Sequence, residues 1–100
     1  MEEIKFKKID DGCIIYATGE IDLSNSHQLR KTILAALKTN NKVYVDLSAV
    51  KYIDSSGIAS LVEGLQFSKS NDKKFFLSNP SSQVKAIIDL TRLDKVFTIV

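Results

Sequence analysis

The sequence contains little cysteine, proline and glycine. Its 100 residues include one cysteine, one proline and four glycines, and there is no tryptophan. A single cysteine cannot form an internal disulfide, and no cysteine–histidine spacing suits a metal. No apolar run approaches the roughly 18 residues of a membrane helix. We therefore expect no metal, no cofactor and no membrane segment.

Basic and acidic residues are present in nearly equal numbers. Fourteen basic and 12 acidic residues give a net charge of +2. The nearest approach to a basic cluster is Lys73-Lys74, which follows Asp72. Because nucleic-acid-binding proteins normally gather their cations on one face, the sequence predicts no direct nucleic-acid binding. A cationic face would have to be assembled by the fold from distant residues.

The composition is that of an ordinary globular domain. Hydrophobic residues make up 44% and charged residues 26% of the chain. The length fits a single domain over residues 1–100. The N-terminal stretch MEEIKFKKIDD is charged and lacks the apolar core of a signal peptide, so we expect a cytoplasmic protein. No broad apolar surface can be read from the pattern, which favours a monomer when the protein is free.

The apolar pattern predicts an α/β domain. Strands are expected at residues 4–8, 13–18, 42–47, 74–78 and 97–100. Asp10-Asp11-Gly12 indicates a hairpin turn between the first two. The alternation in 42–47 indicates one packed and one wetter face. We expect a small mixed, mostly parallel sheet in the order strand-strand-helix-strand-helix-strand-helix-strand, with helices mainly on one face.

Each predicted helix has a recognisable start. The first begins near Asn25, for which Gln28 completes a candidate capping box. The second follows Asp54, and its apolar residues recur at helical spacing. The third follows Asn79, with Pro80 suited to its first turn.

The most informative segment runs from Val45 to Leu65, VDLSAVKYIDSSGIASLVEGL. It reads as a strand, a loop, and polar residues at the start of a helix. The first helical turn has unpaired N–H groups and a partial positive charge, so a phosphate on Ser55 or Ser56 would be favourable there. Asp, Ser and Gly before a helix, taken alone, most often only cap it.

Three motifs together resemble the STAS domain of anti-sigma factor antagonists. The central one is DLSAVKYIDSSGI at 46–58; GEID at 19–22 and NPSSQVKAIIDLTRLDKVF at 79–97 support it. They occur in the family's order and spacing and cover nearly the whole chain. The sequence departs from the family pattern at Ser26, Ala59, Ser60, Glu63 and Arg92. These departures concern the partner surface and helix packing more than the switch.

The resemblance implies a bacterial transcription regulator that acts by partner switching. Its unphosphorylated form would bind an anti-sigma factor, which is also a serine kinase, and thereby release the sigma factor. The kinase would phosphorylate the first serine of D-S-S-G, which is Ser55, and end the binding. A PP2C-type phosphatase would restore it.

The resemblance also assigns roles to the residues around Ser55. Asp22 would contribute to the recognition surface, although its position before a helix also suits a cap or turn. Asp54 could cap the helix or orient a hydroxyl, Ser56 suits a structural hydroxyl, and Gly57 suits a close backbone approach. The predicted partner-binding residues are Asp22, Asp54, Ser55, Ser56 and Gly57, and none is catalytic.

The two alternative functions are a serine hydrolase and a non-switching STAS subunit. A serine hydrolase would need His27, the only histidine, as its base, and DSSG is not a GxSxG nucleophile elbow. A non-switching STAS subunit of a larger regulatory or transport assembly is the stronger alternative. An intact serine at position 55 argues against such a fixed subunit.

Overall fold

The computed structural model describes residues 4–100 and shows alternating strands and helices. The elements are β1 (Lys5–Ile9), β2 (Gly12–Ile21), α1 (Ser26–Thr39), β3 (Lys42–Ile53), α2 (Ser55–Ser70), β4 (Lys74–Ser78), α3 (Ser82–Leu90), a 3₁₀ helix η1 (Leu93–Lys95) and β5 (Thr98–Ile99). This order confirms the prediction, to which the structure adds η1.

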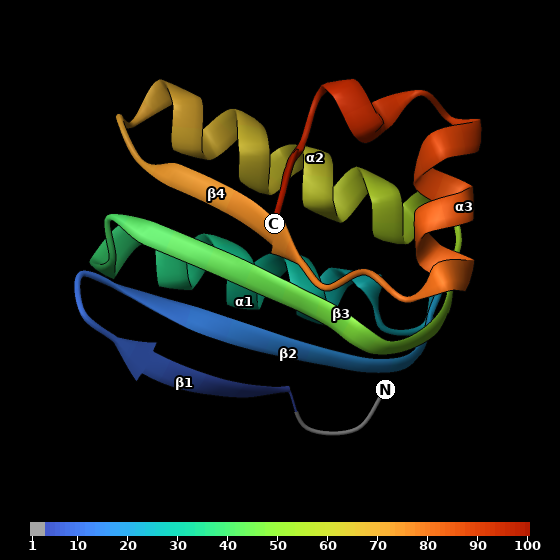
Figure 1. Ribbon diagram of the computed structural model, residues 1–100. Helices are drawn as coiled ribbons and strands as arrows, with labels where there is room; N and C mark the ends of the chain where they lie inside the picture. The colour runs from blue at the N-terminus through green and yellow to red at the C-terminus, as the bar shows by residue number, and fades with distance from the viewer. Residues whose placement is uncertain (1–3) are drawn as a thin grey trace.

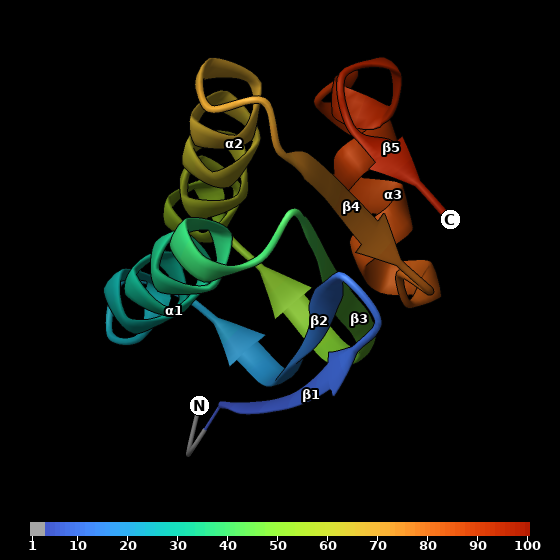
Figure 2. The same cartoon turned by 90° about the vertical axis from the view of Figure 1, so that its left-hand side faces the viewer.

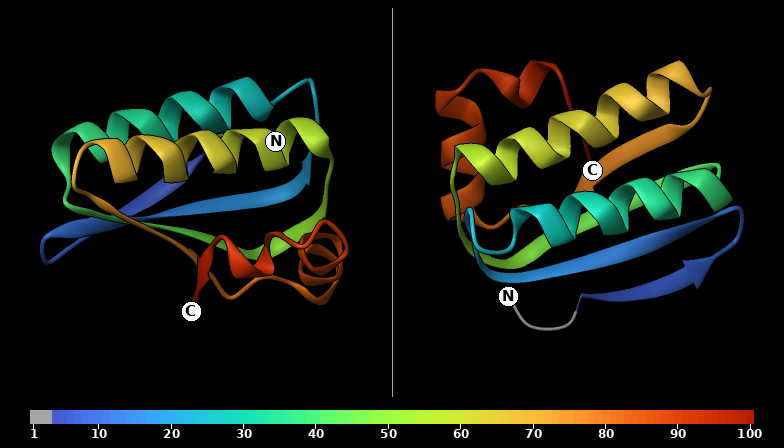
Figure 3. Two further views of the ribbon diagram at one scale, coloured as in Figure 1. Left: turned by 90° about the horizontal axis from the view of Figure 1, so that it is seen from above. Right: turned by 180° about the vertical axis from the view of Figure 1, so that it is seen from behind.

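The strands form one mixed sheet in the order β1-β2-β3-β4-β5. β1 and β2 make an antiparallel hairpin, and the other neighbours are parallel. α1 and α2 run side by side along one face of the sheet, as the views in Figures 2 and 3 show. α3 crosses the end of the sheet and contacts β3 (Figure 1). The predicted mostly parallel sheet with helices mainly on one face is confirmed.

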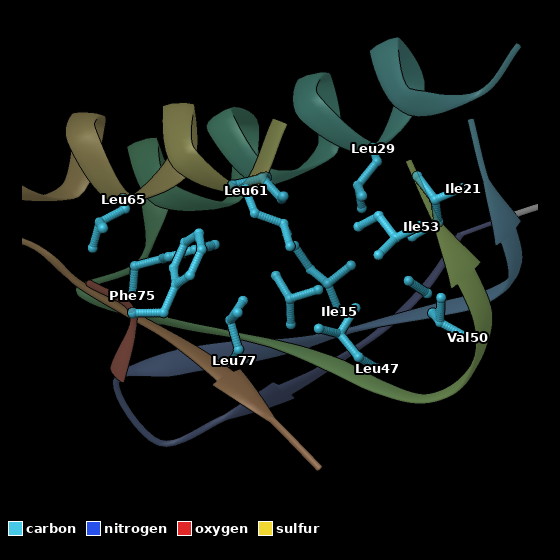
Figure 4. Close-up of a cluster of buried hydrophobic side chains, with 14 of the residues drawn as sticks. Ile15, Ile21, Leu29, Leu47, Val50, Ile53, Leu61, Leu65, Phe75 and Leu77 are labelled. Carbon is cyan, nitrogen blue, oxygen red and sulfur yellow. The ribbon is translucent and has the colours of Figure 1, made fainter. Parts of the chain in front are cut away.

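The hydrophobic core lies between the sheet and the paired helices (Figure 4). Every second residue of the central strands points into it, as the alternation predicts. These inward residues include Cys13, Ile15, Ala17, Val43, Val45 and Leu47. Leu29, Ile33 and Leu37 of α1 and Leu61 and Leu65 of α2 meet them from the helical side. Burial raises the pKa of the Cys13 thiol, consistent with a packing role.

The two central strands are longer than the sequence pattern predicts. The segment 48–53, expected to be a loop, continues β3, and β2 extends to Ile21. The register between them shifts after Tyr16 and again after Gly19, whose φ is +73°. These irregularities interrupt the strict alternation, which explains why the pattern did not extend the strands. They also place Val50 and Ile53 in the core.

Two expectations about helix starts are wrong. The Asn25 side chain does not cap α1; its Oδ1 accepts from the Asp22 N–H at 3.0 Å, and its Nδ2 donates to the Glu20 carbonyl at 2.8 Å. The Asn25 side-chain amide is therefore bound to the backbone of the turn after β2, and the predicted capping box does not form. Pro80 precedes the first turn of α3, because Ser81 is the N-cap residue and accepts from the Val84 N–H.

Candidate functional site

The ends of β2 and β3 bring Asp22 and Asp54 to the same edge of the sheet. The two strands are parallel and paired up to Ile21 and Ile53, so the residues that follow them emerge side by side. The Asp54 N–H donates to the Ile21 carbonyl at 3.0 Å and joins the two turns directly. This edge lies at the start of α2 (Figure 1).

Asp54 caps α2 through one carboxylate oxygen. Its Oδ1 accepts from the Ser56 N–H at 2.9 Å, the Gly57 N–H at 3.1 Å and the Ser56 hydroxyl at 2.5 Å. The Ser56 hydroxyl is the main cause that lowers the pKa of Asp54, and the Leu23 amide acts in the same direction. Asp54 therefore stays ionised at neutral pH and holds the start of the helix in place.

The two serines of the motif differ in environment. Ser56 is half-buried and its hydroxyl is bound to Asp54, whereas Ser55 is exposed as the first residue of α2. Within residues 4–100 the Ser55 hydroxyl has no hydrogen-bond partner. A modifying enzyme could reach Ser55 without disturbing the cap, whereas modification of Ser56 would break it.

Asp22 shapes the neighbouring turn. Its Oδ1 accepts from the Ser24 N–H at 2.9 Å and from the Ser24 hydroxyl at 2.5 Å. The Ser24 hydroxyl is the main cause that lowers the pKa of Asp22, against a weaker opposing effect of the Asp54 charge. Asp22 therefore lies close enough to Asp54, the residue before Ser55, for the two negative charges to interact.

Leu23 is a surface residue that the sequence interpretation missed. Its side chain is 82% exposed, between Asp22 and Ser24. Tyr52, near the end of β3, is 47% exposed. The sequence signal for Leu23 was a large apolar residue between polar residues at a predicted turn. Exposed aliphatic residues of this kind are candidates for partner contact.

Gly57 is required by packing. A Cβ atom built on it would lie 2.5 Å from Cγ1 of Ile53 and 2.7 Å from Cγ2 of Ile21. Only the absence of a side chain lets the first turn of α2 approach the ends of β2 and β3. Gly57 is buried, so its role in the site is to position the turn.

Two of the departures from the family pattern contact each other. The buried Ser60 hydroxyl donates to the Ser26 carbonyl at 2.9 Å and links α2 to α1. Arg30 of α1 and Glu63 of α2 form a second link at 3.4 Å, between partly exposed side chains. These positions therefore bear on the pairing of the two helices behind the site.

His27 shows no arrangement for nucleophilic catalysis. It is exposed on α1, and its Nδ1 lies 3.0 Å from the Arg30 guanidinium. Within residues 4–100 no hydrogen bond joins it to a serine hydroxyl. The same residues contain no cluster of three or more potential metal ligands.

The Asp54→Asn variant removes the charge of the side chain that caps α2 and keeps nearly the same shape. The pKa of Asp54 is lowered in the folded state, so ionisation stabilises the fold above about pH 4, the pKa of an unfolded aspartate. That contribution is lost as the pH falls through the lowered pKa. We expect the variant to melt below the wild type at pH 7, with the difference shrinking towards pH 3. Thermal unfolding followed by circular dichroism measures it.

Asp72→Asn, at an exposed turn, is the matched control for this prediction. It should show no comparable change with pH. A difference for Asp54→Asn that stays constant between pH 7 and pH 3 would contradict the assignment of the stabilisation to the ionised carboxylate.

Comparison with known proteins places this architecture in a family. The STAS domain model matches residues 3–100. A candidate anti-sigma factor antagonist of Thermotoga maritima is 30% identical over 96 residues, which cover 94% of this chain and 85% of that protein. An anti-sigma-B factor antagonist of Staphylococcus epidermidis is 27% identical and covers 84% of this chain and 79% of its own length.

Solved structures agree with these sequence matches. The crystal structure of the Thermotoga maritima protein superposes with a TM-score of 0.88 at 30% identity, over 96% of this chain and 84% of that one. The unphosphorylated anti-sigma factor antagonist SpoIIAA shares the fold, with a TM-score of 0.81 at 18% identity over 98% of this chain and 88% of its own. The chain belongs to the STAS domain family.

Proposed function

We propose that this protein is an anti-sigma factor antagonist controlled by phosphorylation of Ser55. Its unphosphorylated form binds an anti-sigma factor that is also a serine kinase, and this binding releases the sigma factor. The kinase transfers a phosphoryl group from ATP to the Ser55 Oγ, and binding ends. A PP2C-type phosphatase removes the phosphate. The protein acts in the cytoplasm, as a monomer when free.

The observation that carries the proposal is the contrast between the two serines. Ser55 offers an exposed hydroxyl at the first position of α2, and the Ser56 hydroxyl is bound to Asp54. Relatives named anti-sigma factor antagonists support the general role. SpoIIAA, which has the same fold, has also been solved in a phosphorylated form, so this architecture can accommodate a phosphate.

The surface around Ser55 supports a difference in partner binding between the two proposed states. In the unphosphorylated form, exposed Leu23, which follows Asp22, and exposed Tyr52, two residues before Asp54, would supply apolar contact area. Phosphorylation adds about 1.5 to 2 negative charges at pH 7 to Ser55, next to Asp54. The amino end of α2 tolerates that charge, whereas a partner surface that meets a neutral hydroxyl does not. The fold therefore survives, and the complex does not form.

Intact-protein mass spectrometry with peptide mapping, on protein from its native cells, tests the acceptor. We expect a phosphate on Ser55, retained in Ser56→Ala and lost in Ser55→Ala. Phosphate on Ser56 would overturn the assignment of Ser55. Protein that stays unmodified across growth and stress conditions would favour a fixed STAS subunit of a larger assembly instead.

A further inference from the structure

The face of the sheet opposite α1 and α2 collects lysines and aromatic rings that are scattered along the sequence. Figure 1 shows this face, with the strands in front of the two helices. The strand register arranges it in three rows, which together we call the open face. The rows are Lys7, Ile14, Tyr44, Phe76 and Thr98; Lys5, Tyr16, Asp46 and Ser78; and Ile9, Gly12, Lys42 and Lys74.

The open face is cationic. Its rows hold four lysines against one carboxylate, that of Asp46. Lys5, Lys7 and Lys74 are exposed, and Lys42 is half-buried. Because these lysines come from three different strands, they do not form a cluster in the sequence. A surface of this sign favours an anionic partner.

Asp46 is held by its neighbours within the open face. Its Oδ1 accepts from the Ser48 N–H at 3.0 Å and hydroxyl at 2.6 Å, and its Oδ2 accepts from the Asn79 amide at 3.2 Å. The carboxylate retains acceptor capacity toward a ligand. It would repel a phosphate placed directly on it and accept from a hydroxyl or amino group.

Aromatic side chains line a hollow in the middle of the open face. Tyr44 and Phe76 stack with ring centroids 4.6 Å apart and an interplanar angle of 16°. A hollow of about 350 Å³ is bounded by Tyr16, Tyr44 and Asp46, among others, and by Val100 at the C-terminal end of the chain. The hollow thus offers aromatic walls and polar groups that include the Asp46 carboxylate, Ser78 and Asn79, and the lysines of the open face are not among its lining residues.

We propose that the open face binds single-stranded RNA. Phosphates would lie on the lysines, and an unpaired base would stack against the aromatic wall of the hollow. The Asp46 carboxylate would accept from a ribose 2′-hydroxyl, which DNA lacks, so RNA is favoured over DNA. Duplexes are excluded, since their bases are stacked inside the helix and cannot enter the hollow.

This activity is separate from the proposed switch. Lys42 and Lys74 are the first residues of β3 and β4, whereas Asp54 and Ser55 follow the last residue of β3. Lys42 and Ser55 therefore lie at opposite ends of β3, and Lys74 is paired beside Lys42. Ser55→Asp should leave RNA binding unchanged, so failure of one proposal does not entail failure of the other.

Fluorescence anisotropy with a labelled 12-nucleotide single-stranded RNA at low salt tests the inference. Lys42→Gln/Lys74→Gln should weaken binding about tenfold, and Tyr44→Leu, which removes one stacking surface, should weaken it at least about fivefold. For three or four phosphate contacts, the plot of log K against log salt concentration should have a slope of about −2 to −3. Thermal unfolding of each variant establishes that it is folded.

The matched control is Lys31→Gln/Lys38→Gln, which removes the same charge from exposed positions of α1 on the other side of the sheet. It should bind RNA like the wild type. Equal losses in the two double variants, equal affinity for DNA of the same sequence, or no binding at millimolar protein would each overturn the proposal. Tighter binding of poly-glutamate than of RNA would also overturn it and indicate an acidic protein partner.

Discussion

Ser55→Asp is expected to weaken binding of the anti-sigma factor about a hundredfold, and Ser55→Ala is expected to preserve it. A hundredfold loss corresponds to about 2.8 kcal/mol. The cause is the placement of an additional charge beside Asp22 and Asp54, on a surface whose partner meets a neutral hydroxyl. The partner can be isolated with Ser55→Ala as bait, and isothermal titration calorimetry then compares the variants.

Ser82→Asp is the matched control, because Ser82 is the exposed first residue of α3, as Ser55 is of α2. It introduces the same charge at the same helix position away from the site and should leave binding unchanged. The melting temperature of Ser55→Asp should not fall, since an acidic residue is favourable at a helix start. A loss of binding that accompanies unfolding would argue against a switch that acts at the interface.

Gly57→Ala is expected to lower the free energy of unfolding by about 2 to 3 kcal/mol, as overpacked core positions do. Helix propensity alone predicts that Gly57→Ala raises the free energy of unfolding, because alanine is about 1 kcal/mol more favourable than glycine inside a helix. The packing term prevails because the new Cβ would lie 2.5 Å from Cγ1 of buried Ile53 and 2.7 Å from Cγ2 of buried Ile21. Urea denaturation measures the difference.

Ile53→Ala provides the coupled variant for this test, since it removes the side-chain atoms nearest the new Cβ. The double variant Gly57→Ala/Ile53→Ala should be less destabilised than the sum of the two single variants. Ala59→Gly, at an exposed position of the same helix, measures propensity alone and should cost about 1 kcal/mol. A Gly57→Ala protein more stable than the wild type would refute the packing argument.

Local pattern was enough to predict most of the architecture. The alternation of Val43, Val45 and Leu47 correctly identified the inward face of β3, because side chains of a strand alternate whatever its neighbours are. The D-S-S-G segment correctly predicted the start of α2, because its cap is built by residues adjacent in sequence. The order of elements, and hence the mostly parallel sheet, followed from the same local signals.

Some local signals were overruled by contacts between distant segments. The Asn25 side chain is used by the backbone turn after β2, so the predicted capping box does not form. Segment 48–53 pairs with the end of β2 through an irregular register that no periodicity reveals. Each case depends on a partner strand or turn whose position the pattern of the segment itself does not contain.

The sequence by itself therefore determined the elements, the inward faces of the strands and the family motif, all of which depend on neighbouring residues. Only the tertiary structure decided which distant residues meet. It joined Asp22 to the Ser55 turn, distinguished the exposed Ser55 from the bonded Ser56, and assembled the open face from three lysine-bearing strands. The physical reason is that strand register, which long-range hydrogen bonds and core packing set together, places side chains from different strands side by side.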